Sequence, residues 1–162
     1  MITKSHLQRL YQWSLETEFP LKKEGITSNY MGYEILICYL KYGKKRIFYP
    51  HKSLSESISD IIVKPEIYSL TYIHYPPKLN AKPHRDYNPY NKKFKRIQLP
   101  IKIPDGNKCY IEWIDTEERV YWQKGKVEIF DVEKLHQGAN ESDQSMEFLY
   151  IDVKYDTLVE ID

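Results

Sequence analysis

A histidine and an aspartate lie two residues apart near the middle of the chain, and a second histidine follows much later. The pair is His84 and Asp86, and the distal histidine is His136. On an extended segment, residues two apart point to the same face, so the first two side chains would lie together. Two histidines and a carboxylate form a three-ligand set that suits non-haem Fe(II), with open positions for a cosubstrate and dioxygen. We therefore predict a metal site at these three residues.

A His-x-Asp sequence alone is weak evidence, because such short patterns also occur by chance in surface loops. The order of the segments strengthens the prediction: several predicted strands separate the pair from His136, which follows a predicted strand at 127–130. In a double-sheet β fold, strands distant in sequence lie side by side, so all three ligands can reach one barrel mouth. The other candidates lack partners, and we interpret His51 as a loop residue and His74 as a strand-end residue.

Two helices are expected in the first part of the chain. Apolar residues at helical intervals predict one over 5–19, with Ser5 and Gln8 as a capping box. A second is predicted over 53–63, closed by a proline. Both are expected to pack against a sheet.

Most of the remaining chain consists of short apolar segments separated by turn-forming residues. This pattern predicts a mainly β protein, a double-stranded β-helix of the jelly-roll or cupin type with N-terminal buttressing helices. We expect one domain over 1–162, with helices and a hairpin in 1–65 and the metal-binding β core in 66–155. The predicted strands are 33–42 and 46–49, which form the hairpin, then 67–75, 96–103, 108–113, 119–122, 126–132 and 147–155.

Composition excludes several classes of protein. The formal net charge of +1 gives no overall attraction to nucleic acid or to an anionic membrane. Cys38 and Cys109 lie in apolar runs and are expected to be buried, reduced thiols. The N-terminal residues lack the apolar core of a signal peptide, and no stretch has membrane-spanning length. We expect a cytoplasmic protein that does not bind membranes; its Lys, Ile, Tyr and Asn bias is typical of AT-rich genomes, including those of phages and viruses.

The segment 67–153 resembles the aspartyl/asparaginyl β-hydroxylase branch of the 2-oxoglutarate- and Fe(II)-dependent oxygenases, which includes some free-proline hydroxylases. The matching phrases are Pro-His-Arg-Asp, Arg-Ile-Gln-Leu-Pro-Ile from Arg96, and Gly-Lys-Val-Glu-Ile-Phe-Asp before His136. The resemblance implies a double-stranded β-helix with His84, Asp86 and His136 as iron ligands. It also implies hydroxylation by O2, coupled to oxidative decarboxylation of 2-oxoglutarate to succinate.

One family position departs from the resemblance. The far carboxylate of 2-oxoglutarate usually meets an arginine a short distance after the distal histidine, and here that position is Met146. Strict alternation along the strand at 96–103 puts Arg96, Gln98 and Lys102 on one face. We predict Lys102 as the replacement anchor, with Arg96 and Gln98 near the metal end. The alternative interpretation is that Lys102 is an ordinary solvent-facing lysine.

The loop 87–95 interleaves aromatic and basic residues directly after the metal motif. It could receive an acidic peptide or stack a nucleobase, or it could be a solvated loop that covers the barrel mouth. The leading hypothesis is an oxygenase that hydroxylates a peptidyl residue or a free amino acid. The alternatives are an oxygenase that acts on a nucleobase, and a non-catalytic binding module on a degenerate oxygenase fold.

Overall fold

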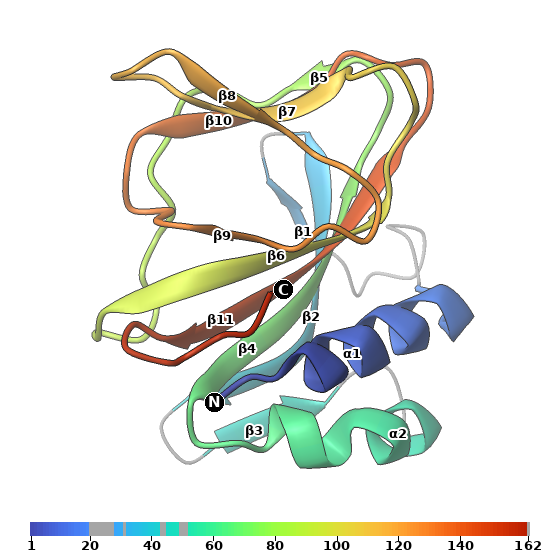
Figure 1. Cartoon of the computed structure of the whole chain (residues 1–162), viewed down its shortest axis with the longest axis vertical. Coiled ribbons are helices and arrows are strands. Elements are labelled where there is room, and N and C mark those ends of the chain that lie inside the picture. Colours follow the sequence, from blue (N-terminus) through green and yellow to red (C-terminus); the bar gives the residue numbers. More distant parts are fainter. Residues whose placement is uncertain (20–27, 31, 43–44, 49–51, 162) are drawn as a thin grey trace.

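Two antiparallel sheets face each other in the computed structural model, which describes residues 1–19, 28–30, 32–42, 45–48 and 52–161 (Figure 1). Two helices, α1 (Lys4–Glu16) and α2 (Lys52–Ile62), cover the outer face of the larger sheet. The described strands are β1 (Ser28–Tyr30), β2 (Tyr33–Tyr42), β3 (Lys45–Phe48), β4 (Ile67–Tyr75), β5 (Leu79–Asn80), β6 (Phe94–Lys102), β7 (Cys109–Trp113), β8 (Glu118–Tyr121), β9 (Glu128–Phe130), β10 (His136–Asn140) and β11 (Met146–Lys154).

The strand order joins segments that are far apart in sequence. The larger sheet runs β1-β2-β4-β11-β6-β9, with β3 paired to β2, and the smaller sheet runs β5-β10-β7-β8. The C-terminal strand β11 therefore lies between β4 and β6 in the larger sheet. The predicted mainly β double-sheet fold with N-terminal helices is confirmed.

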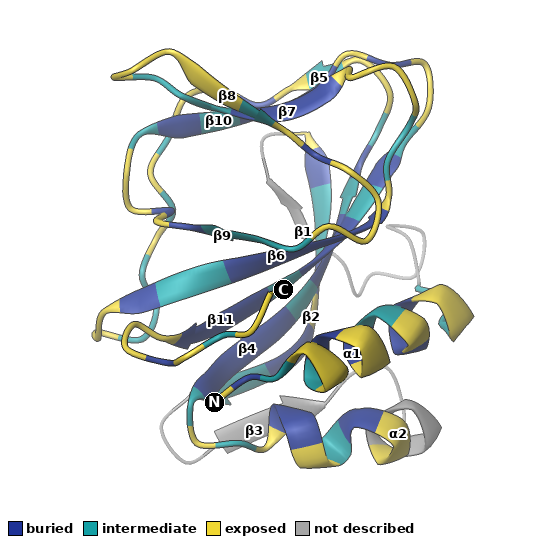
Figure 2. Cartoon of the chain, viewed as in Figure 1, coloured by how far each residue is buried: buried dark blue, intermediate teal, exposed yellow. Residues whose placement is uncertain are grey.

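Alternation along the central strands divides the apolar residues between two cores. Phe148 of β11 points between the two sheets, whereas its neighbours Leu149 and Ile151 point towards the helices. Leu10 of α1 and Ile61 of α2 fill the helix side, because apolar residues recur at helical intervals on one face of each helix. Figure 2 shows these buried faces turned towards the sheet.

The predicted start of the first helix is wrong by a short distance. Thr3 is the N-cap residue, and it forms the capping box with His6 instead of the predicted pair Ser5 and Gln8. The Thr3 side chain accepts the backbone N–H of His6, and the His6 imidazole accepts the backbone N–H of Thr3. The imidazole nitrogen replaces the carboxylate or amide oxygen that the sequence rule requires.

Three short strands were not predicted, and one of them carries a site residue. β1 and β5 are very short, and β10 contains Gly138 and Asn140, residue types that are depleted in strands. His136, which was predicted only to follow a strand, is itself the first residue of β10. Pairing with β7 along the whole of β10 overrides the weak local propensity.

The two cysteines are free and buried, as predicted. Burial raises the pKa of Cys109 to about 11, so this residue is a protonated thiol at neutral pH. No helix in the described part of the chain is long and apolar enough to span a bilayer. His51 lies outside the described residues.

Candidate metal centre

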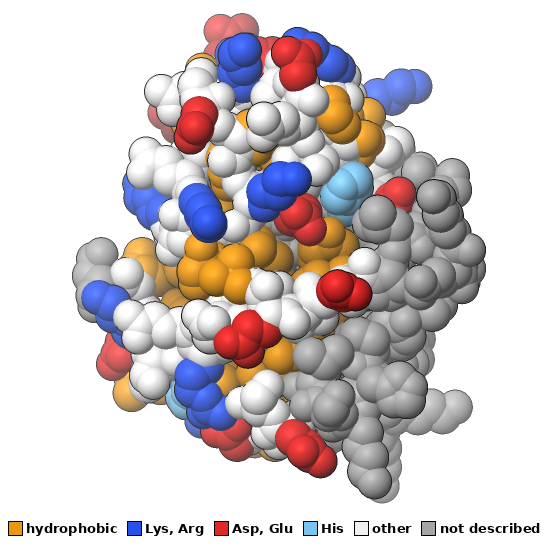
Figure 3. All heavy atoms as spheres, turned by 90° about the vertical axis from the view of Figure 1, so that its right-hand side faces the viewer, with side chains coloured by type: hydrophobic (Ala, Val, Ile, Leu, Met, Phe, Trp, Pro, Cys, Tyr) orange, Lys and Arg blue, Asp and Glu red, His pale blue; other side chains and the backbone are white. Residues whose placement is uncertain are grey.

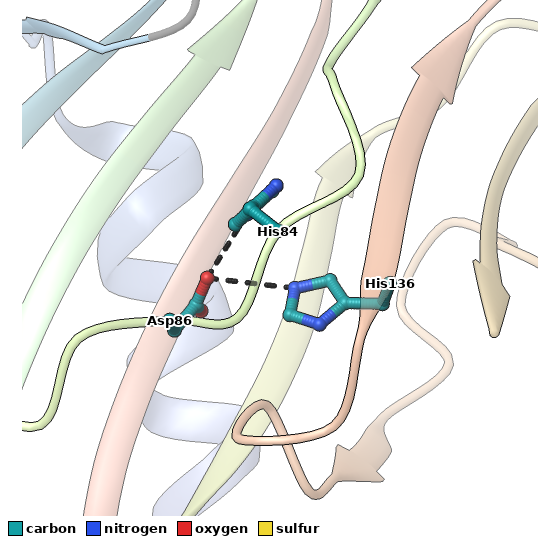
Figure 4. Close-up of side chains that lie close together, drawn as sticks. All are labelled: His84, Asp86 and His136. Atoms are coloured by element: carbon teal, nitrogen blue, oxygen red, sulfur yellow. Dashed lines mark ion pairs between the residues drawn. The ribbon is translucent and has the colours of Figure 1, made fainter. Parts of the chain in front are cut away.

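The two candidate histidines face each other across a short backbone bridge. The amide of His84 donates to the carbonyl of His136 at 2.8 Å, and the amide of His136 donates to the carbonyl of His84 at 2.9 Å. Side chains of directly opposed residues leave on the same face, and the two ring centroids are 4.7 Å apart. Figure 4 shows both rings beside Asp86.

Asp86 completes the cluster from the segment that follows β5. Its amide donates to the carbonyl of Val132 at 2.9 Å, which holds the carboxylate beside the bridge. Oδ1 of Asp86 lies 3.0 Å from Nε2 of His84 and 3.4 Å from Nε2 of His136. All three candidate ligand atoms lie within 4.8 Å of one another. The structure therefore brings the predicted trio together, with an N, N, O donor set that suits divalent iron.

Each histidine ring is oriented by a carbonyl two residues earlier in the chain. Nδ1 of His84 donates to the carbonyl of Lys82 at 2.7 Å, and Nδ1 of His136 donates to that of Lys134 at 2.6 Å. Protein histidines that bind metals usually donate the other ring N–H in this way, which fixes the tautomer and the ring direction. Both Nε2 atoms are thereby left to face Asp86.

The surroundings of Asp86 favour its ionised form. Burial alone would raise the pKa of its carboxyl group, but hydrogen bonds from His136 and His84 and the charge of Arg96 outweigh burial and lower it. Burial likewise opposes the charged form of His84, but its bonds to Asp86 and to the Lys82 carbonyl outweigh this and raise its pKa. A metal ion at Nε2 of His84 therefore competes with a proton for the same nitrogen.

Metal affinity should depend on pH in one direction. Because the pKa of His84 is raised above its ordinary value of 6.5, the proton competes with a metal up to a pH above that value. We expect the affinity for Zn(II), used as an air-stable probe, to fall as the pH is lowered through this window. Titration at a series of pH values measures the effect, and a pH-independent affinity would show that His84 is not a ligand.

Arg96 is bonded to two carboxylates, the buried Asp152 and the partly buried Asp86. Its Nη1 pairs with Oδ2 of Asp86, while Nε and Nη2 donate to the two oxygens of Asp152 at 2.7 and 2.9 Å. The guanidinium also lies over the Tyr150 ring, 4.8 Å from its centroid. These contacts place the Arg96 guanidinium beside Asp86, near the metal end as predicted, and its contact with a cosubstrate stays a prediction.

Gln98 lines a small inner cavity together with the three candidate ligands. Its Oε1 accepts the indole N–H of Trp122 at 2.9 Å, which fixes the amide plane. The cavity has a volume of about 20 Å³, room for roughly one water molecule. Its other lining residues, which the sequence analysis did not assign to the site, are Tyr33, Tyr75, Ile111, Trp122, Gly138 and Tyr150.

Lys102 lies away from this cavity. The register between β6 and β11 shifts, so that Pro100 is opposite Phe148 but Lys102 is opposite Glu147. This irregularity breaks the alternation on which the prediction of Lys102 depended. Lys102 is exposed, with Nζ 3.3 Å from Oγ of Ser145, and it lines a separate cavity of about 690 Å³ beside the end of α1. The structure does not bring Lys102 together with the candidate ligands.

His74 lines the same separate cavity and is not part of the cluster, as its interpretation as a strand-end residue implied.

Met146, which stands at the family's arginine position, is fully buried in the core between the two sheets. Figure 3 shows one side of the molecule, where hydrophobic side chains lie between acidic and basic ones. Acidic and basic side chains are interspersed on the described part of this face.

Gly138 is needed where β10 passes the inner cavity. A Cβ at this position would lie 2.7 Å from the hydroxyl oxygen of Tyr75 and 3.3 Å from its Cζ. The Tyr75 ring is buried and stacked on Tyr33, with ring centroids 4.5 Å apart, so it has little room to move. We expect Gly138→Ala to lower the free energy of unfolding by about 1–3 kcal/mol. Urea denaturation measures this, and an unchanged midpoint would contradict the close approach.

An outer groove of about 330 Å³ opens beside the cluster. It shares Tyr33, Asp86 and Tyr150 with the inner cavity, so the two spaces meet at the candidate ligand Asp86. The loop after the metal motif forms one wall, with Tyr90 bonded to Asp152 at 2.6 Å and to Ser69 at 2.7 Å. Sequence reasoning identified this loop but not the strand residues that form the groove floor.

Comparison with known proteins shows the family. The sequence model of the aspartyl/asparaginyl β-hydroxylases matches residues 42–155, more than two thirds of the chain, and the chain belongs to this family. None of the curated proteins compared with the chain matches it.

Solved structures with the same fold include a hydroxylase and a cupin barrel protein, both of low identity to this chain. The viral collagen prolyl hydroxylase of Paramecium Bursaria Chlorella virus-1, in a 2-oxoglutarate complex, has a TM-score of 0.51 and 12% identity, over 82% of this chain and 84% of that chain. A Cupin 2 conserved barrel domain protein from Salinispora arenicola has a TM-score of 0.50 and 9% identity, over 85% of this chain and 89% of that chain. At these identities the likeness shows the fold alone.

Proposed function

We propose that this chain is a non-haem Fe(II)-dependent oxygenase that uses 2-oxoglutarate and O2 to hydroxylate a peptidyl residue or a free amino acid. The observation that carries the proposal is the convergence of His84 Nε2, His136 Nε2 and Asp86 Oδ1 at one end of the barrel. Membership of a hydroxylase family supports it. When bound, iron and its cosubstrate would supply the oxidising chemistry, while the protein provides orientation and exclusion of water.

The residues around the cluster fit an iron ion. The two backbone carbonyls that accept from Nδ1 hold both rings with Nε2 towards the site. Arg96 holds Oδ2 of Asp86, which leaves Oδ1 as the oxygen that faces the histidines. Three protein ligands on one side leave the remaining positions open, as such chemistry requires.

The described lining of the inner cavity offers a cosubstrate hydrogen-bond donors but no lysine or arginine. Among its described lining residues, the Gln98 amide and the Tyr75 hydroxyl are groups that could hold a carboxylate. At about 20 Å³ the cavity is too small for 2-oxoglutarate as it stands, so binding requires the lining of the cavity to rearrange. Because a carboxylate without a paired cation is costly to bury, we expect 2-oxoglutarate to bind weakly.

An anaerobic absorption experiment tests the proposal without knowledge of the substrate. Fe(II) is added first and 2-oxoglutarate second, and the visible spectrum is recorded after each addition. We expect a weak charge-transfer band that needs both additions and saturates only at high 2-oxoglutarate concentration. Succinate, which lacks the keto acid, is the matched control and should give no band. Iron binding without a band would reject 2-oxoglutarate, and absence of iron binding would favour the binding-module alternative.

The structure weakens the reason for proposing a nucleobase substrate. That hypothesis rests on the loop 87–95 as a stacking platform, but the Tyr90 hydroxyl is bonded to Asp152 and Ser69, so this ring is part of the fold. Tyr87, which is 84% exposed and lines the outer groove, remains available for stacking. We therefore propose a peptide or amino-acid substrate ahead of a nucleic acid.

A further inference from the structure

The outer groove beside the candidate ligands has an apolar floor. Ile35 and Ile37 of β2 and Ile73 of β4 lie on the sheet face that looks towards the smaller sheet, and Ile37 is 43% exposed. A register shift after Ile37 places Leu40 on the same lining. These side chains make much of the described lining apolar in the groove that also contains Asp86.

The charged groups of the groove are already paired with one another. Its described charged lining residues are Asp86, Arg96 and Asp152, and the arginine is bonded to both carboxylates. Of its described polar groups, the Ser69 and Tyr90 hydroxyls are bonded to each other. A negatively charged side chain in this groove would lose its hydration and meet an arginine that is already bonded to two carboxylates, which is costly.

We propose that the groove binds an uncharged aliphatic side chain presented by a peptide segment. The inference rests on the proposed function, because it assigns a substrate class to the same site. It departs from the aspartyl and asparaginyl side chains after which the family is named. A free amino acid carries a carboxylate, and the arginine of the described groove is already bonded to two carboxylates, whereas a peptide segment does not bring this terminal charge into the groove. A volume of about 330 Å³ is near the lower end for small ligands and accepts one side chain with adjoining backbone.

A binding experiment tests the inference independently of catalysis. Fluorescein-labelled peptides with acetylated and amidated ends and identical Gly-Ser flanks carry leucine, proline, aspartate or asparagine at the centre. Binding to the Zn(II)-loaded protein is followed by fluorescence anisotropy. We expect the leucyl or prolyl peptide to bind at least about tenfold more tightly than the aspartyl and asparaginyl peptides. Equal or tighter binding of either polar peptide would overturn the inference.

A matched pair of variants places the binding in the groove. Ile37→Lys puts a charge on the partly exposed floor, and we expect it to weaken the best aliphatic peptide about tenfold. Leu158→Lys, at a 73% exposed position outside the groove lining, is the control and should leave binding unchanged. Equal effects of the two variants would reject the groove as the binding site.

The experiment separates this inference from the proposed function. The anisotropy titrations need neither iron nor 2-oxoglutarate, so an aliphatic preference that Ile37→Lys abolishes supports the groove even if the charge-transfer band is absent. A band accompanied by a preference for aspartate would support the oxygenase and reject the aliphatic substrate.

Discussion

Asp86→Ala should lower the affinity for Fe(II) by more than about 100-fold, the largest effect we expect on metal binding. Loss of a residue that only supports a ligand typically costs about 10–100-fold, and loss of a ligand itself should cost more. Asp86 supplies the one oxygen that faces both histidines. Anaerobic titration followed by iron analysis after gel filtration measures the affinity.

The control for this variant is Asp143→Ala. Asp143 has a side chain that is 85% exposed and pairs with Lys78 on the surface, so its removal should leave iron binding unchanged. The Asp86 variant should still fold, because Arg96 keeps its two bonds to Asp152. Folded Asp86→Ala protein that binds iron as tightly as the unaltered protein would reject the assignment of this cluster.

The cluster could be predicted because two of its residues are neighbours in the sequence and the third is brought to them by the predicted fold. His84 and Asp86 share a face of an extended segment, which the two-residue spacing states directly. The arrival of His136 follows from the double-sheet fold, but its pairing with His84 through two backbone hydrogen bonds has no signature in the spacing. The sequence therefore predicted the trio but not the backbone bridge that sets the distance between the rings.

Lys102 was predicted on the wrong face of its strand, because a register shift after Pro100 interrupts the alternation of side chains along β6. Arg96 and Gln98 lie before the register shift and do line the space between the sheets. Lys102 lies after the shift and faces the cavity beside α1. A signal was present: Pro100 stands inside β6, and proline within a sheet commonly marks a bulge. Contacts such as that of Arg96 with Asp152 depend on tertiary neighbours and leave no such local mark.

Arg96→Met should lower the free energy of unfolding by about 3–5 kcal/mol, the largest effect on stability that we expect. The substitution keeps an unbranched side chain but leaves Asp86 and Asp152, whose side chains are 15% and 3% exposed, without their shared cation. Because Oδ2 of Asp86 would no longer be held, iron affinity should also fall about 10–100-fold. Urea denaturation measures the first effect and anaerobic titration the second.

A comparable arginine on the surface provides the control for this prediction. Arg119 donates through Nε to Glu112 at 2.6 Å and lies over the Tyr110 ring, but its side chain is 42% exposed. Water can solvate Glu112 once the arginine is gone, so Arg119→Met should have a much smaller effect. Equal destabilisation by the two variants would show that loss of the arginine stem, and not of the buried charge, is responsible.

The double variant Arg96→Met/Asp152→Asn distinguishes charge from packing. If the cost of Arg96→Met arises from two carboxylates left without a cation, removal of the Asp152 charge should restore part of the stability. The Tyr90 hydroxyl would then still have the amide oxygen as acceptor, in place of the carboxylate that it now contacts. Iron affinity should stay low in the double variant, because Asp86 still lacks the guanidinium that holds Oδ2. Recovery of stability without recovery of iron affinity would establish Arg96 as the residue that positions the ligand.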